Sequence, residues 1–183
     1  ATVSNLLSIA QIVTLFITPF VMKKLSKRNL FMAGMTLATV GFVISGLSTS
    51  YSVICLSSVI KGIGFGCGGA SMFGCLQDAI TYGEWYNGYG TAGMGNAASS
   101  FCMKVGSGIG TAALGWILSA GKFDAEVAVT DQLPSALASI NFAFAWVPVI
   151  TSVICVVCMF FFDIDKHYGK VVEDLSKGKH RGE

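Results

Sequence analysis

Charged residues are scarce in this 183-residue chain, at 12% of the sequence. A soluble domain carries about twice that fraction, so the composition argues against a soluble globular protein. Histidine is scarce as well: His167 and His180 stand alone in a polar tail, too isolated for a metal site. No Gly-x-x-x-x-Gly-Lys-Ser/Thr phosphate loop occurs. Hydrophobic residues, in contrast, make up 53% of the chain.

The few cationic residues are unevenly placed. Of twelve Lys and Arg, four lie within residues 23–28 and five lie beyond Phe162. Hydrophobic spans joined by short polar loops have this pattern. Five segments are apolar and long enough to cross a bilayer: about residues 3–22, 30–47, 52–80, 93–120 and 138–162. The sequence therefore predicts an all-α, polytopic membrane helix bundle over residues 1–162 and a tail over 163–183.

The basic segments also predict an orientation. Basic loops favour the cytoplasmic side, so residues 23–28 and 166–181 are expected there. This gives a multi-pass protein of the cytoplasmic membrane with its C-terminus inside. The loop of residues 81–90 is then internal, and residues 49–51 and 121–137 are external, the latter with Asp124, Glu126 and Asp131. An odd number of spans and a start at Ala1 lead us to expect an absent N-terminal part.

Glycine is frequent, with 22 residues, and it clusters in two spans. The third span contains Gly62-x-x-x-Gly66 and Gly64-x-x-x-Gly68, and the fourth contains Gly106-x-x-x-Gly110. Small residues four apart let membrane helices approach closely, so tight packing is the favoured interpretation. The alternative is a bend or a space for ligand at residues 66–69.

Lys104 lies in the middle of the fourth span, which has no other charge. A cation at that depth costs about 2.5–3.5 kcal/mol on insertion scales unless water, a counter-charge or a ligand meets it. Helical spacing places small and polar residues on its face, among them Ser100, Ser107 and Thr111. Ionisable residues at membrane depth usually line a substrate or ion path. Lys104 therefore makes a transporter the first hypothesis. A lysine snorkelling to an interface is the alternative.

Lys61 is a second cation within a span, and a pathway role and snorkelling are equally favoured. Pro148 predicts a kink in the last span.

All six cysteines fall in apolar stretches, so a disulfide framework is not expected. Cys155 and Cys158 have redox spacing, but packing is the favoured role.

One stretch carries a family resemblance. Asp78-Ala-Ile-Thr-Tyr-Gly-Glu-Trp-Tyr-Asn-Gly88, then a glycine-rich link and Ser99-Ser-Phe-Cys-Met-Lys-Val-Gly-Ser-Gly-Ile-Gly110, resembles the glycoside–pentoside–hexuronide:cation symporters. These are sugar carriers of the major facilitator superfamily, the melibiose carrier among them. The resemblance implies the C-terminal half of such a carrier, with residues 1–162 as helices eight to twelve of twelve. The derived topology agrees with this independently.

The resemblance also implies roles for residues. Lys104 would take part in sugar recognition and cation coupling, and Ser100 would line the sugar site with Ser99 beside it. Separately from the resemblance, we expect a cytoplasmic gate at Asp78, Tyr82, Glu84 and Trp85. In it, Asp78 and Glu84 would form ion pairs with basic loops and latch the inward-closed state, and the alternative is that both are ordinary solvated loop acids. Two departures are Thr81, where the family often has a second acid, and the absence of a sugar-stacking Trp near Gly69.

The predicted function is therefore part of a secondary transporter rather than an enzyme. It would carry a sugar, glycoside or hexuronide by symport with sodium or proton, with no other cofactor and no metal site. Its partners would be the substrate, the lipid bilayer and the N-terminal half of the same carrier, with no nucleic acid. The alternatives are a transport-incompetent fragment or packing and regulatory membrane protein, and a redox protein using Cys155 and Cys158.

Overall fold

The computed structural model describes residues 2–48, 50–124, 127 and 132–180, and these residues contain helices and no strand. The all-α class predicted from the sequence is thus confirmed. The elements, in chain order, are α1 Thr2–Met22, α2 Lys27–Leu47, α3 Tyr51–Asn87, α4 Ala92–Ala120, α5 Pro134–Asn141, the π-helical η2 Phe142–Trp146, α6 Val147–Phe160, the 3₁₀ turn η3 Ile164–Lys166, and α7 Tyr168–Ser176. In the predicted external loop, Glu126 and Asp131 lie outside the described residues.

Five helical segments of the described chain are long and apolar enough to cross a membrane. They are α1, α2, α3, α4 and the continuous run Pro134–Phe160. Each one matches a predicted span, although most boundaries move outward by a few residues. A spanning helix satisfies its backbone internally, which lipid requires. The chain is therefore a multi-pass membrane protein.

The third span is much longer than predicted, because α3 runs for 37 residues. The predicted internal loop of residues 81–90 was wrong over most of its length: the chain stays helical to Asn87, and its side-chain amide donates to Gly83 O at 2.7 Å. The helix ends at Gly88, whose φ of 77° is the left-handed conformation that glycine adopts readily. At about 1.5 Å per residue, α3 is about 55 Å long, so part of it projects beyond the bilayer.

The glycines of α3 allow two helices to approach it on different faces. A Cβ at Gly62 would lie 2.5 Å from Leu7 O, and one at Gly66 would lie 2.7 Å from Thr14 Cβ, both on α1. A Cβ at Gly64 would lie 2.6 Å from Gly34 O on α2. Tight packing is thus confirmed for these glycines. The helix continues without interruption through residues 66–69, where a bend or a space for ligand was the alternative.

The last span contains a local change of helical register rather than a chain break. Phe142–Trp146 forms a π-helical segment, and the Val147 amide donates to Phe142 O, five residues earlier. Pro148 follows immediately and has no amide hydrogen to donate. A π-bulge next to a proline rearranges the backbone hydrogen bonds around the missing donor, which is the form that the predicted distortion takes.

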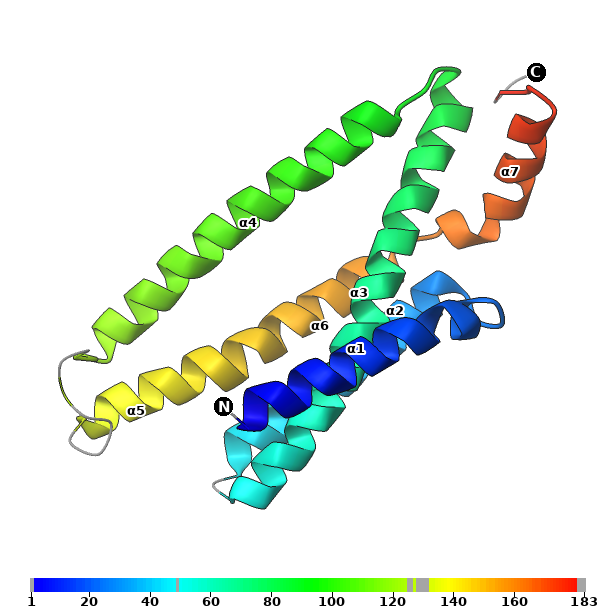
Figure 1. Ribbon diagram of the computed structural model, residues 1–183. Coiled ribbons are helices and arrows are strands. Elements are labelled where there is room, and N and C mark those ends of the chain that lie inside the picture. The colour runs from blue at the N-terminus through cyan, green and yellow to red at the C-terminus, as the bar shows by residue number, and fades with distance from the viewer. Residues whose placement is uncertain (1, 49, 125–126, 128–131, 181–183) are drawn as a thin grey trace.

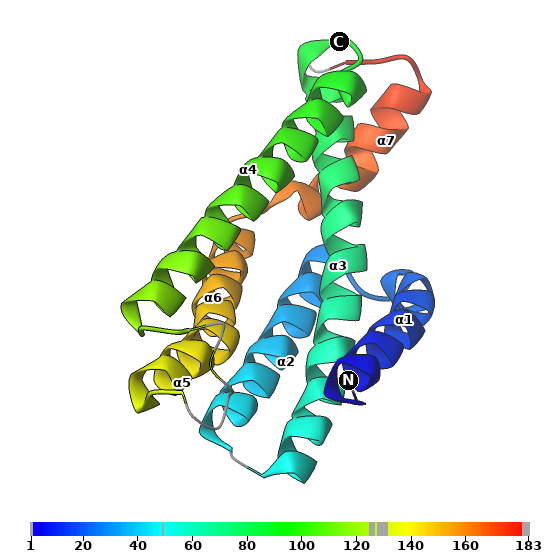
Figure 2. The ribbon, with the colours of Figure 1, turned by 60° about the vertical axis from the view of Figure 1, so that its left-hand side comes forward.

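The helices form one packed group and one helix that stands apart. Both α1 and α2 pack closely on α3, and α6 packs on α2. Figures 1 and 2 show α4 diverging from this group, joined to α3 at one end and to α5 at the other. No residue of α4 is buried. Beyond α6 the chain returns to α3, where α7 packs beside the end of that helix opposite its N-terminus.

Candidate functional site

Lys104 lies on α4, the helix that stands apart. Its α-carbon is 12 residues from Ala92, about 18 Å along the helix, which is near the middle of a 30 Å hydrocarbon layer. Ser100, Ser107 and Thr111 follow the same face at helical spacing and are exposed, as Lys104 is. Ser99 is half-buried and lies beside them.

The polar groups of this face make few contacts inside the chain. Thr111 donates its hydroxyl hydrogen to Ser107 O at 2.9 Å, as a helical threonine does to its own backbone. Within the described residues, Lys104 has no ion-pair partner and no cation–π partner. The predicted sugar-site residues therefore form one polar stripe, and the described chain leaves that stripe uncovered.

Lys61 has different surroundings. It is buried between α3 and α2, 8% exposed, and its ammonium lies 5.1 Å from the centroid of the Phe42 ring. Phe42 packs edge-on against Phe65 at 5.6 Å. A Cβ at Gly41 would lie 2.7 Å from Lys61 Cγ, so this glycine makes room for the lysine stem. Lys61 thus faces α2, and the structure does not bring it together with the polar stripe of α4.

A charged cluster occupies the end of the bundle where α1 meets α2, which we call the charged end. Asp78 of α3 is buried, with 2% of its side chain exposed, and both of its oxygens accept hydrogen bonds from the ammonium of Lys27, at 2.6 and 2.8 Å. Lys27 begins α2. A buried carboxylate needs such a partner, and we call this ion pair the Lys27–Asp78 latch.

The segment after α6 adds acidic groups to the same end. The Asp165 carboxylate accepts hydrogen bonds from the Ser26 hydroxyl and from the Arg28 amide, the latter at 3.2 Å. Arg28 also donates to Phe160 O at 2.7 Å and lies 3.7 Å from an Asp163 oxygen. The first amides of a helix have no partner inside it, so Asp165 supplies the cap that α2 lacks locally.

The other predicted gate residues lie further along α3. The Trp85 indole N–H donates to Asp174 of α7 at 3.1 Å. The Tyr82 ring lies 5.7 Å from that of Trp85 and 6.2 Å from that of Tyr86. Glu84 is half-buried and forms no ion pair within the described residues. Asp78 and Glu84 therefore have different surroundings, although the sequence motif contains both.

Sequence reasoning missed the partners that α7 supplies. The ammonium of Lys27 lies 4.9 Å from the centroid of the Tyr168 ring. Burial, and then the negative charge of Asp78, raise the pKa of the Tyr168 phenol above its ordinary value, so the phenol stays uncharged at physiological pH. The acids and aromatics near the end of the chain were the available signal, but their distance in sequence from Lys27 and Trp85 concealed the pairing.

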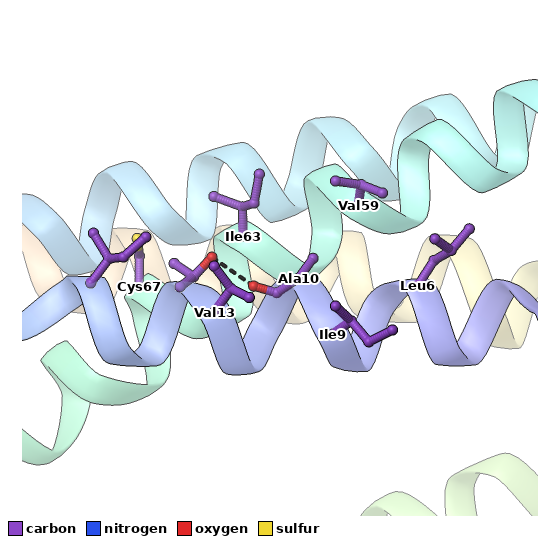
Figure 3. Close-up of a pocket in the computed structure, with 9 residues that line it drawn as sticks. Leu6, Ile9, Ala10, Val13, Val59, Ile63 and Cys67 are labelled. Atoms are coloured by element: carbon purple, nitrogen blue, oxygen red, sulfur yellow. Dashed lines mark hydrogen bonds between the residues drawn. The ribbon is translucent and has the colours of Figure 1, made fainter.

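The cavities differ sharply in chemistry. A groove of about 540 Å³ between α1 and α3 is lined by apolar side chains such as Leu6, Ile9 and Val59 (Figure 3). Its one hydroxyl, on Thr14, already donates to Ala10 O at 2.7 Å. A sugar needs several free donors and acceptors, so this groove does not suit one. A smaller cavity of about 200 Å³ at the charged end is lined by Lys27, Asp78 and Tyr168 among others.

No group of three or more potential metal ligands occurs among the residues that the structure describes. On α6, Cys158 is exposed and Cys155 half-buried, and both are free thiols. Within the described residues, no metal-ligand group accompanies these two thiols.

Comparison with known proteins identifies the family. The family described as MFS/sugar transport protein matches residues 1–166. The isoprimeverose transporter of Lactiplantibacillus pentosus is 35% identical over 180 residues, which is 97% of this chain and 37% of that protein. The inner membrane symporter YicJ of Escherichia coli K12 is 32% identical over 108 residues, 58% of this chain and 23% of that protein. The glucuronide carrier protein homolog of the same bacterium is 25% identical over 166 residues, 89% and 36%.

No solved structure matches this chain. The chain spans less than two fifths of the length of the curated relatives it matches. The family is a transporter family rather than an enzyme class, in agreement with the apolar helices and the resemblance noted above. The chain belongs to the MFS/sugar transport protein family, as a relative of the glycoside–pentoside–hexuronide symporters of the major facilitator superfamily.

Proposed function

We propose that this protein is part of a secondary active transporter that carries a sugar, glycoside or hexuronide across the cytoplasmic membrane by symport with Na⁺ or H⁺. The family match supports transport of a sugar. The names of two relatives, an isoprimeverose transporter and a glucuronide carrier homolog, favour a glycoside or an acidic sugar over a lipid or drug.

We place the charged end on the cytoplasmic side, with residues 1–162 as helices eight to twelve and residues 163–183 as a cytoplasmic tail. The support is that the basic segment of residues 23–28 and the segment after α6 meet at this end, through contacts such as Arg28–Asp163 and Lys27–Tyr168. Because basic segments favour the cytoplasm, their meeting at one end of the bundle gives both the same side.

The single observation that carries the proposal is the position of Lys104, mid-span on an uncovered polar stripe. A cation kept at this depth requires water, a counter-charge or a ligand beside it. A hydrophilic passage next to α4 meets that requirement, and the hydroxyls of Ser100, Ser107 and Thr111 suit such a passage.

In the proposed mechanism, the Lys104 ammonium donates hydrogen bonds to substrate hydroxyls or to a sugar carboxylate. When the site is empty, it pairs with a carboxylate of the remaining part of the carrier. The exchange of Lys104 between these two partners links sugar binding to cation binding. Ser100, one turn before Lys104, offers a hydroxyl to the same substrate.

The test is sugar uptake by the protein as its gene encodes it, with Lys104→Ala and Lys104→Arg. We expect Lys104→Ala to lower coupled uptake by about tenfold or more, since a hydrogen bond to a charged group contributes about 1.5–3 kcal/mol. Lys104→Arg keeps the charge but changes donor geometry, so it separates the two effects. Lys179→Ala, at an exposed lysine of the tail, is the matched control. Unchanged coupled uptake in both Lys104 variants would reject the role.

We further propose that the Lys27–Asp78 latch stabilises the state closed on the cytoplasmic side. The support is geometric: Lys27 is the first residue of α2 and Asp78 lies in the last third of α3, so the ion pair joins two spans at the charged end. If these helices separate when the carrier opens, Asp78 loses its ion-pair partner. Tyr82, Glu84 and Trp85 remain proposed members of the gate.

A further inference from the structure

The segment after α6 folds back beside the Lys27–Asp78 latch and contacts the two helices that carry it. Its first anchor is Asp165, which holds the Ser26 hydroxyl and the Arg28 amide at the start of α2. Its second anchor is Asp174, which accepts the indole N–H of Trp85 on α3 at 3.1 Å. Residues 163–176 thus bridge the two helices that the latch joins, and we call them the strap.

Between these two anchors, the strap places Tyr168 against Lys27. The ring centroid is 4.9 Å from the Lys27 ammonium. On the other side, the lysine stem crosses α3 at Gly74, where a Cβ would lie 3.0 Å from Lys27 Cδ. The side chain is therefore confined between Gly74 and Tyr168, with its ammonium on Asp78.

This confinement has an electrostatic consequence. An aromatic face attracts a cation, by about 0.5–1 kcal/mol at exposed sites and more where water is excluded. The Lys27 side chain is 31% exposed and that of Asp78 only 2%, so the ring covers the more accessible partner of the ion pair. Because the phenol stays uncharged, Tyr168 adds no competing charge.

We infer that the strap controls how often the latch opens, with Tyr168 as a positioning residue that holds the Lys27 ammonium on Asp78. This inference rests on the proposed role of the latch in a carrier. Separation of Lys27 from Asp78 then requires either that Tyr168 leaves the ammonium or that the whole strap undocks from Trp85. The segment after α6 is in this way a regulatory element of transport rather than a passive tail.

The chain supplies its own reporter of latch opening. Cys75 lies one turn before Asp78 on α3 and is 4% exposed. Its reaction with N-ethylmaleimide, in a protein whose other cysteines are replaced by serine, measures access to the latch. A matched protein that keeps only Cys158, which is exposed on α6, reports general changes in reactivity.

The experiment compares Tyr168→Leu, Tyr168→Phe and Asp174→Ala in the protein as its gene encodes it. Tyr168→Leu removes the aromatic face, and we expect Cys75 to react about two- to fivefold faster, as the loss of a cation–π contact implies. Tyr168→Phe keeps the aromatic face and loses only the phenol oxygen beside Asp78, so it should react more slowly than Tyr168→Leu. Asp174→Ala weakens the second anchor at a half-buried position and should also accelerate labelling. Cys158 labelling should not change in any variant.

Unchanged Cys75 labelling in both Tyr168→Leu and Asp174→Ala overturns the inference, and so does equal acceleration in Tyr168→Phe and Tyr168→Leu. Should Tyr168→Leu fail to fold, Asp174→Ala alone decides, since an unchanged rate there contradicts the strap. Labelling needs no sugar, so the outcome is separate from the fate of the proposed function. If the protein transports no sugar, the proposed carrier function is refuted. If it transports sugar but Cys75 labelling does not depend on the strap, only this inference is refuted.

Discussion

At the scale of single residues, Asp78 is the group that most needs its neighbours. A buried carboxylate without a partner destabilises the folded protein. Removal of one member of a buried ion pair lowers the free energy of unfolding by about 3–5 kcal/mol. Here the partner is Lys27, whose stem passes close to Gly74 on its way to Asp78. The sequence motif singled out Asp78, but it contained no indication of which of the cations at residues 23–28 would meet it.

Asp78→Asn tests the latch at this scale. The amide keeps the shape and loses the charge, so the state closed on the cytoplasmic side is less populated. Because binding from outside needs that state, we expect the KM for external sugar to rise, about tenfold for each 1.4 kcal/mol of lost stabilisation. The maximal rate should change less. Initial uptake rates over a range of external sugar concentrations measure both parameters.

The charge-swapped pair Lys27→Asp with Asp78→Lys provides the control for this variant. It restores an ion pair of reversed direction and should recover part of the lost affinity, whereas each single reversal should not. An unchanged KM in Asp78→Asn, or a swap no better than either single reversal, would show that this ion pair has no part in closing the carrier.

At the scale of elements, α3 organises the fold through its glycines. Helix α1 packs against Gly62 and Gly66, and α2 packs against Gly64 and Gly68. The four-residue spacing was visible in the sequence, and close packing followed from it. The assignment of each pair to a different helix was not visible, because it depends on the angular position around α3 and on the order of the neighbours.

Gly64→Ala and Gly69→Ala test this account as a matched pair on one helix. A methyl group at Gly64 would lie 2.6 Å from Ala38 N and from Gly34 O, both backbone atoms, whereas one at Gly69 meets nothing within 4 Å. We expect Gly64→Ala to lower stability by about 1–3 kcal/mol, as overpacking does. Gly69→Ala should be neutral or raise it slightly, by up to about 1 kcal/mol. Thermal unfolding in detergent compares the two, and equal stabilities would contradict the packing.

Helix ends were harder to predict than helices. The sequence predicts residues 81–87 as part of a loop, yet they extend α3 in contact with α7. Trp85 accounts for part of this, since its indole is held by Asp174. Periodicity and hydropathy depend on local sequence alone. They therefore cannot reveal that Trp85 is held by a partner 89 residues away.

At the scale of the whole molecule, the chain divides into a packed group around α3 and the divergent α4 (Figures 1 and 2). The spans and their order were predictable from the sequence, since lipid imposes length and hydropathy on each. The surroundings of the predicted sugar site were not, because Ser100, Lys104, Ser107 and Thr111 lie on the helix with no buried residue. We propose that water and substrate lie beside that stripe.

The most direct measurement is the accessibility of the two sides of α4 to a water-soluble thiol reagent, in an otherwise cysteine-free protein. Ser107→Cys lies on the face of Lys104, and Ile109→Cys replaces an exposed apolar residue on the opposite side. We predict that the reagent modifies Ser107→Cys, that transported sugar slows this reaction, and that Ile109→Cys stays unmodified. Equal modification at both positions, or none at Ser107→Cys, would contradict a hydrophilic passage beside Lys104.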